Sequence, residues 1–154
     1  MDDEFVFAGE ESQIESDATR PWNILVVDDD VDVHVATKLT LENVRIHGRS
    51  LYLIDVHSGH EAISTLKANQ QIDLILLDMI MENRESGLDV ANWLRSESGC
   101  YDKPIIILRT GQAGVFKDSE ILQNKNFNAI VEKSSLTRAS FIGLLTKMLP
   151  GAEA

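Results

Sequence analysis

Five short runs of consecutive apolar residues recur along the chain after residue 21. These runs are rich in Val, Ile and Leu, and they lie at residues 24–27, 51–54, 74–77 (with Ile72 just before), 105–108 and 129–131. Continuous apolar runs of this length are typical of strands buried on both faces of a parallel sheet. The pattern therefore predicts five buried strands.

Segments with helical spacing separate these runs. Val31, Val35 and Leu39 lie four residues apart, and residues 62–66 and 88–94 each place apolar side chains on one face. The clearest helical stripe comes last and consists of Phe141, Leu144, Leu145 and Met148. Only residues 111–127 fit a helix poorly. Strands that alternate with helices predict a doubly wound α/β fold: a flavodoxin-like parallel sheet of five strands in the order 2-1-3-4-5, with helices on both faces.

The 154 residues suit one domain with a tail. Residues 1–20 hold seven acidic residues and one basic residue, and their apolar positions show neither a helical nor a strand period. We therefore expect an acidic, mobile or loosely docked tail over residues 1–21. The folded domain is expected over residues 22–149, and residues 150–154 are its end or the start of a linker.

The net charge of −11 argues against nucleic acid and anionic membranes as partners, since both select basic surfaces. No apolar run approaches the roughly 18–20 residues that span a bilayer. The acidic N-terminus does not resemble a signal peptide. The single cysteine, Cys100, excludes an internal disulfide and suits a reducing compartment, so we expect a cytoplasmic location.

Reactive side chains follow the predicted strands where each strand ends. They are Asp28, Asp29 and Asp30 after the first strand, Asp78 after the third, Arg109 and Thr110 after the fourth, and Lys133 after the fifth. Ligands of such folds bind beyond the carboxyl ends of the central strands. Clustered carboxylates repel one another unless a cation joins them, and Mg²⁺ prefers carboxylate oxygens. A carboxylate can attack phosphorus, and a lysine, a metal ion and a hydroxyl can stabilise the transferred group.

Each residue also has an ordinary structural interpretation. Asp30 or Asp32 can cap the helix that begins near Val31. Asp78 alone can be a turn residue, and Lys133 alone a solvated charge. The placement of all these residues at the ends of the predicted strands favours a shared functional site over separate structural roles. The four histidines lack a ligand-like spacing, and both tryptophans are expected to pack.

The runs ILVVDDD (residues 24–30) and LILLDMIM (residues 74–81), with the strand that ends in Thr110 and with Lys133, resemble the receiver domain of two-component response regulators. The resemblance covers residues 22–149. It implies that Asp78 is the phosphoacceptor and that Lys133 contacts the phosphoryl group. It implies that Asp28, Asp29, Asp78 and the backbone carbonyl of Ile80 hold Mg²⁺.

The same resemblance implies a sensor histidine kinase or phosphotransfer protein as donor, and a second copy of the chain is a further candidate partner. A narrower set of motifs, including residues 108–112 (LRTGQ) and 132–134 (EKS), resembles receivers that precede a domain of unknown function and an HD-GYP-type output. This chain carries no output motif, so the output is expected C-terminal to it or on a separate effector.

Three positions depart from most receivers. Glu82 replaces a proline, Ser134 replaces a proline, so no cis peptide is expected after Lys133, and Ile130 replaces the aromatic residue that rotates on activation. These departures leave open a degenerate receiver that docks without phosphorylation. A second alternative has a different basis. Asp28-x-Asp30 after an apolar strand resembles the nucleophile motif of haloacid-dehalogenase-type phosphatases, in which Asp28 would be the nucleophile.

A further alternative concerns which residue of the fourth strand corresponds to the Thr or Ser whose hydroxyl faces the phosphate in most receivers. Counted without gaps from Pro104, the Thr or Ser of most receivers falls on Arg109, one residue before Thr110. We favour Thr110, because a Thr-Gly pair resembles the usual Thr/Ser-Ala pair. Neighbouring strand residues point to opposite faces, so only one of the two can face the phosphate.

Overall fold

The computed structural model describes residues 20–68, 71–79, 86–96, 104–111 and 126–151. Its strands are β1 (Trp22–Val27), β2 (Arg45–Ile46), β3 (Arg49–Val56), β4 (Leu74–Asp78), β5 (Ile105–Thr110) and β6 (Ala129–Glu132). Its helices are α2 (Val31–Thr40), α3 (Gly59–Ala68), α4 (Ser86–Ser96), α6 (Arg138–Met148) and the short 3₁₀ helix η2 (Lys133–Ser135). The poorly helical residues 112–125, the acidic residues 1–19 and Cys100 lie outside the described part.

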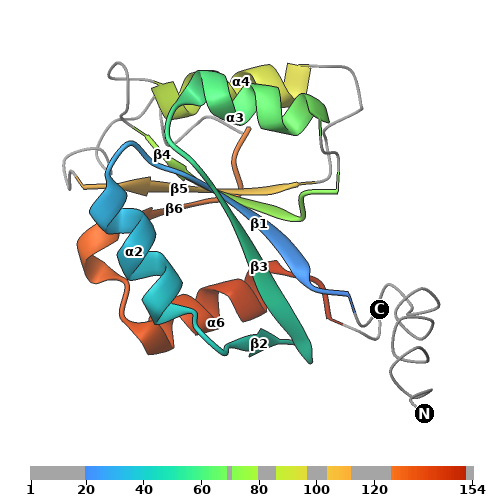
Figure 1. The fold of residues 1–154 in the computed structure, drawn as a ribbon, viewed down its shortest axis with the longest axis vertical. Helices are drawn as coiled ribbons and strands as arrows, with labels where there is room; N and C mark the ends of the chain where they lie inside the picture. The colour runs from blue at the N-terminus through green and yellow to red at the C-terminus, as the bar shows by residue number, and fades with distance from the viewer. Residues whose placement is uncertain (1–19, 69–70, 80–85, 97–103, 112–125, 152–154) are drawn as a thin grey trace, which may run out of the picture.

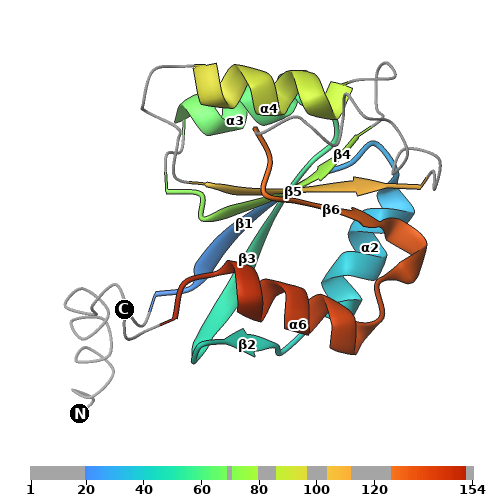
Figure 2. The same ribbon diagram turned by 180° about the vertical axis from the view of Figure 1, so that it is seen from behind.

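The strand order of the sheet is β2-β3-β1-β4-β5-β6. The strands from β3 to β6 pair in parallel, and their order is the predicted 2-1-3-4-5. Helices α3 and α4 cover one face, and α2 and α6 cover the other (Figures 1 and 2). The predicted flavodoxin-like architecture is therefore confirmed. None of the helices in the described ranges is long and apolar enough to cross a bilayer.

The sheet has six strands instead of the predicted five, because a short hairpin extends its edge. Strand β2 pairs antiparallel with the start of β3. The two residues between them, His47 and Gly48, have φ angles of 52° and 80°. Two consecutive positive φ angles form the tight turn whose twist suits a hairpin. A strand of two residues shows no hydrophobic period, so the sequence pattern could not reveal it.

Two apolar clusters fill the space between the sheet and its helices. Leu25, Leu77 and Leu108 pack under α3 and α4, whereas Val26 and Ile107 face α6. Alternate residues of each central strand thus enter opposite clusters, as a pleated strand requires. This double burial explains the continuous apolar runs. Both tryptophans pack as expected: Trp22 is buried, and Trp93 packs against the first cluster.

Helix α2 turns its apolar spacing outward. Val31, Val35 and Leu39, which we call the outer stripe, are exposed by 62%, 52% and 65%. The buried face of α2 instead carries the polar residues His34 and Thr37. This face lies against the polar end of the sheet, where hydrogen bonds compensate the burial of both side chains. The apolar spacing located the helix correctly but does not mark its core face.

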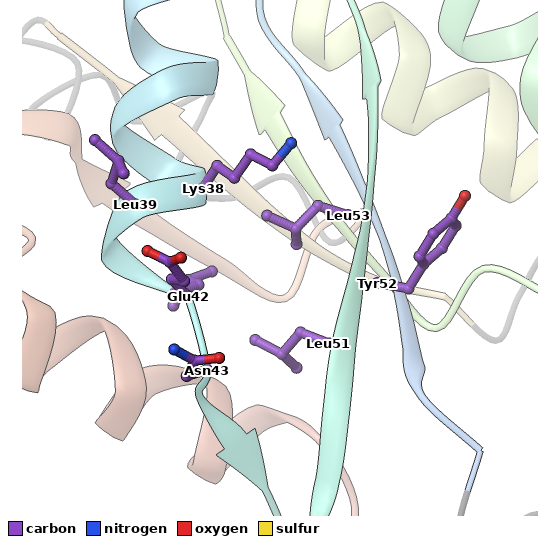
Figure 3. A pocket seen from close by; sticks show the side chains of 8 residues that line it. Lys38, Leu39, Glu42, Asn43, Leu51, Tyr52 and Leu53 are labelled. Atoms are coloured by element: carbon purple, nitrogen blue, oxygen red, sulfur yellow. The ribbon is translucent and has the colours of Figure 1, made fainter.

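A groove of about 390 Å³ adjoins the outer stripe between the end of α2 and strand β3. In Figure 3, the side chains of Leu51 and Leu53 point from β3 toward α2, and Tyr52 points to the other side. Lys38 and Glu42 lie at the helix side of the groove. Its rim is therefore charged, although its wall is apolar.

The outward orientation of α2 gives a first prediction. Leu39→Gln should change the free energy of unfolding by less than about 0.5 kcal/mol, because the side chain is largely in water already. Leu66→Ala on α3, where the side chain is 1% exposed, should lower it by about 2–5 kcal/mol. Urea denaturation measures both. An equal loss in the two variants would place Leu39 in the core and contradict the orientation of α2.

The start of α4 gives a second prediction, because Gly87 packs directly on the end of β4. Its N–H donates to the carbonyl of Met79 at 2.9 Å, and a Cβ at this position would lie 2.7 Å from the Cα of Met79. Gly87→Ala should therefore lower the free energy of unfolding by about 1–3 kcal/mol. Gly143→Ala on α6 is the control. A Cβ there meets nothing within 4 Å, and the better helix propensity should raise stability by up to about 1 kcal/mol. Thermal melts of the pair that shift in the same direction would contradict this packing.

Candidate functional site

Four charged residues lie on one face of the sheet at the carboxyl ends of its central strands. We call Asp28, Asp78, Arg109 and Lys133 the charged row. Asp78 pairs with Arg109 in register, and Asp28 directly follows the pair formed by Val27 and Leu77. Lys133 follows β6 two residues beyond Val131, so it keeps the same face. The parallel register therefore brings together the residues that the sequence placed at separate strand ends.

The ammonium group of Lys133 bridges the two buried carboxylates of the row. Its Nζ lies 2.9 Å from Oδ2 of Asp28 and 3.4 Å from Oδ1 of Asp78. Both aspartates are almost fully buried, whereas the Lys133 side chain is 24% exposed. Two adjacent buried carboxylates repel each other, and the positive charge of the ammonium group between them offsets this repulsion.

Three carboxylates of this region form a set that could hold a metal ion. One oxygen from each of Asp28, Asp29 and Asp78 lies within 4.8 Å of the others. Oδ1 of Asp28 accepts a hydrogen bond from the backbone of Asp30. Its Oδ2, despite the close ammonium group, has no partner in hydrogen-bond geometry within the described residues. A buried oxygen with unused acceptor capacity and an all-oxygen donor set fit Mg²⁺. The expected carbonyl ligand, Ile80, lies outside the described residues.

The third aspartate of the DDD run has a structural role. Asp30 is the N-cap of α2, and its side chain accepts a hydrogen bond of 2.9 Å from the backbone N–H of Asp32. The expected capping role of Asp30 is therefore confirmed. Two aspartates of the run face the site, and the third starts the helix that covers it.

The register of β5 favours Arg109 over Thr110 at the site. β5 pairs with β4 without interruption from Ile105 to Arg109, and this register places Arg109 opposite Asp78 at the end of the strand. Thr110 is buried but continues the alternate row of Ile106 and Leu108, which faces α3 and α4. This result differs from the preference for Thr110 at the sequence level. That preference rested on the chemistry of a Thr-Gly pair, which carries no information on register.

The environment of Arg109 supports this placement. Its side chain is 3% exposed, and Nη1 donates a hydrogen bond of 3.0 Å to Oγ1 of Thr37. Burial lowers the pKa of Arg109 below its ordinary value, and the negative charges of Asp28 and Asp78 oppose this shift. The guanidinium group thus experiences the field of both carboxylates, as a group inside the site must.

His34 is a neighbour of the site that the sequence did not single out for it. Its Nε2 lies 2.8 Å from the carbonyl oxygen of Asp28, and its Nδ1 lies 3.0 Å from Oδ1 of Asp55. Both ring nitrogens therefore have an oxygen partner within hydrogen-bond distance. The ring therefore ties α2 to the ends of β1 and β3. No sequence spacing links positions 34 and 55, so only the sheet order could reveal this contact.

Two of the three departures from the usual receiver pattern, Ile130 and Ser134, lie in the described residues. Ile130 is partly buried and packs against the cluster under α3 and α4. The peptide bond after Lys133 is trans, as the serine at position 134 predicts. Glu82 lies outside the described residues. Position 130 thus carries a packed aliphatic side chain instead of the aromatic side chain that rotates on activation in most receivers.

Comparisons with known proteins agree with this geometry. Residues 24–139 match the family described as the response regulator receiver domain. The chain is also 34% identical over 143 residues to "3'3'-cGAMP-specific phosphodiesterase 2" of Vibrio cholerae. The alignment covers 92% of this chain but 27% of that protein, so the chain spans about a quarter of its relative.

Solved structures share the fold at low sequence identity. The signal receiver domain of an HD domain-containing protein from Pseudomonas fluorescens Pf-5 superposes with a TM-score of 0.70 at 15% identity, over 88% of this chain and 92% of that one. A two-component response regulator from Cytophaga hutchinsonii gives a TM-score of 0.65 at 20% identity, over 84% and 97%. The family match decides against the haloacid-dehalogenase-type alternative. Since it covers most of the chain and coincides with the charged row, the chain belongs to the response regulator receiver domain family.

Proposed function

We propose that this receiver domain accepts a phosphoryl group on Asp78 and changes conformation in response. The observation that carries the proposal is the ion pair of Lys133 with both Asp28 and Asp78 at the carboxyl ends of the strands. An ammonium group held 3.4 Å from the acceptor carboxylate is placed to neutralise charge on a transferred phosphoryl group.

The transfer itself is a substitution at phosphorus. A carboxylate oxygen of Asp78 forms the new O–P bond while the N–P bond of a donor phosphohistidine breaks. The departing imidazole keeps the electron pair and takes up a proton. Lys133 holds the reacting carboxylate and its neighbour Asp28 in place throughout. Asp28, Asp29, Asp78 and the carbonyl of Ile80 would hold Mg²⁺, which supplies positive charge to the phosphoryl oxygens when bound.

The proposed partners follow from this chemistry. The donor is a sensor histidine kinase or a phosphotransfer protein in the cytoplasm. The output is a domain beyond residues 150–154 or a separate effector, and a second copy of the chain is a further candidate. The Vibrio cholerae relative, of which this chain matches 27%, is named as a phosphodiesterase, which supports a C-terminal output domain. Within the chain, we assign residues 1–21 to a tail and residues 22–149 to the receiver domain.

One alternative keeps a specific observation in its favour. A receiver that docks without phosphorylation is supported by the bulky Arg109 in place of a small hydroxyl residue and by Ile130 in place of an aromatic one. Against it, Lys133 pairs with both Asp28 and Asp78, and an oxygen of Asp29 lies within 4.8 Å of oxygens of the two aspartates. Direct phosphorylation separates the two functions.

Incubation with acetyl phosphate and Mg²⁺ should add a single phosphoryl group, measured as an increase of about 80 Da in intact mass. Asp78→Asn should abolish the adduct, and Asp28→Asn should not move it to another residue. Asp73→Asn is the matched control and should retain the adduct, because Asp73 pairs with Arg20 away from the charged row. An adduct that persists in Asp78→Asn would contradict Asp78 as the acceptor.

Mg²⁺ should raise the melting temperature of the unphosphorylated protein, because binding to the folded state alone stabilises it. Asp29→Ala should melt higher than wild type without metal, since one of three clustered charges is gone, and should lose the response to Mg²⁺. Glu42→Ala removes an exposed charge on the groove rim and should keep the full response. A normal Mg²⁺ shift in Asp29→Ala would exclude Asp29 as a ligand.

A further inference from the structure

The guanidinium group of Arg109 carries more hydrogen-bond donors than its surroundings use. The side chain is 3% exposed, and among the described residues it donates one hydrogen bond, from Nη1 to Thr37. Its Nε and Nη2 have no acceptor within the described residues. A buried donor without an acceptor is costly, and more so when it is charged. Such a group is explained when an acceptor arrives during function.

Arg109 and Lys133 both line a cavity between the sheet and α2. A cavity of about 120 Å³ is lined by Arg109 and Lys133 on the sheet side and by Thr37 and other residues of α2. Arg109 is also the register partner of Asp78, and its backbone carbonyl accepts a hydrogen bond of 3.0 Å from the N–H of Met79. The two cations therefore flank the carboxylate that we propose as the phosphoacceptor.

Phosphorylation changes the formal charge of this row from zero to about −1. Two carboxylates and two cations cancel formally in the unmodified protein. A phosphoryl group on Asp78 replaces one negative charge by about two and adds oxygen acceptors. The planar guanidinium fork matches such oxygens with two parallel N–H donors. Arg109 is thus suited to the oxygens that phosphorylation creates, which the unmodified carboxylate does not provide.

We propose that Arg109 binds the phosphoryl group on Asp78 through Nε and Nη2, and that its hydrogen bond to Thr37 passes this event to helix α2. The inference rests on the proposed phosphorylation of Asp78. Arg109 takes the place of the small hydroxyl residue that the resemblance to other receivers implies. Thr37 is a positioning residue, because it acts on the phosphoryl group only through Arg109.

The route to α2 follows from the position of Thr37 on that helix. Thr37 is buried on the inner face of α2, and the outer stripe of Val31, Val35 and Leu39 lies on the exposed face. When Nε and Nη2 of Arg109 bind phosphoryl oxygens, the guanidinium group is fixed in place. Its Nη1, which donates to Thr37, then holds the middle of α2 more firmly to the sheet. Phosphorylation is therefore expected to change the local stability of α2, which presents the exposed apolar side chains.

The test combines intact mass with hydrogen exchange on the full chain, with acetyl phosphate and Mg²⁺ as the probe. In the phosphorylated wild type, backbone amides of residues 31–40 should exchange about fivefold more slowly than in the unmodified protein. Arg109→Met should still gain the mass adduct but lose this slowing. Arg109→Lys keeps the positive charge without the planar fork and should lose most of the slowing. This variant serves as a second test if Arg109→Met misfolds.

Two threonines of α2 form a matched pair for the second half of the proposal. Thr37→Val should retain the adduct but lose the slowing, because the link between Arg109 and α2 is cut. Thr40→Val removes the same hydroxyl from the same cavity wall and should behave as wild type.

Each result has one meaning. Slowing of α2 exchange that survives in both Arg109 variants overturns the inference and leaves the proposed phosphorylation intact. If Thr110→Val loses the slowing and Arg109→Met keeps it, Thr110 binds the phosphoryl group, and the inference on Arg109 is also overturned. A wild type that gains no adduct at Asp78 overturns the proposed function, and the inference with it.

Discussion

The ion pair that Lys133 forms with two buried aspartates is the interaction on which the site depends. Asp28 and Asp78 belong to adjacent strands, so the parallel register that builds the core also forces their carboxylates together. Lys133 reaches them from β6, across the end of β5. Without this ammonium group, Arg109 alone would face two buried carboxylates, and the most buried part of the sheet would end in excess negative charge, which is costly to bury.

The same electrostatic constraint explains the unusual character of α2. A helix that covers a polar strand end cannot bury an apolar face there without leaving hydrogen-bonding groups unsatisfied. His34 and Thr37 provide side-chain contacts for the Asp28 carbonyl and for Arg109, respectively. The apolar residues of the helix are left outside as a consequence. The chemistry of the site and the exposed stripe are therefore two results of one requirement.

Much of the architecture could be predicted from the sequence, because it follows from patterns with a clear period. Five strands, their order and the gathering of Asp28, Asp78 and Lys133 follow from apolar runs that end in charged residues. The predicted burial is correct for β1, β4 and β5, whereas most residues of β3 and β6 are only partly buried because these strands lie toward the edges of the sheet. The hairpin strand β2 escaped because two residues show no period. The face of α2 was missed because hydropathy does not register a buried threonine or histidine that is hydrogen-bonded. The place of Arg109 depends on strand register, which a single sequence does not encode locally.

Gly87 constrains how a domain of this kind can diversify. The backbone of Asp78 and Met79 lies so close to its Cα that no side chain fits, which closes that position to variation. Asp28, Asp78 and Lys133 are fixed by mutual charge compensation. The end of β5 is different, because a cavity adjoins Arg109 and accommodates a larger residue. The end of β5 is therefore the position around the charged row where the packing leaves most room for a side chain of a different length, and a long arginine occupies it here.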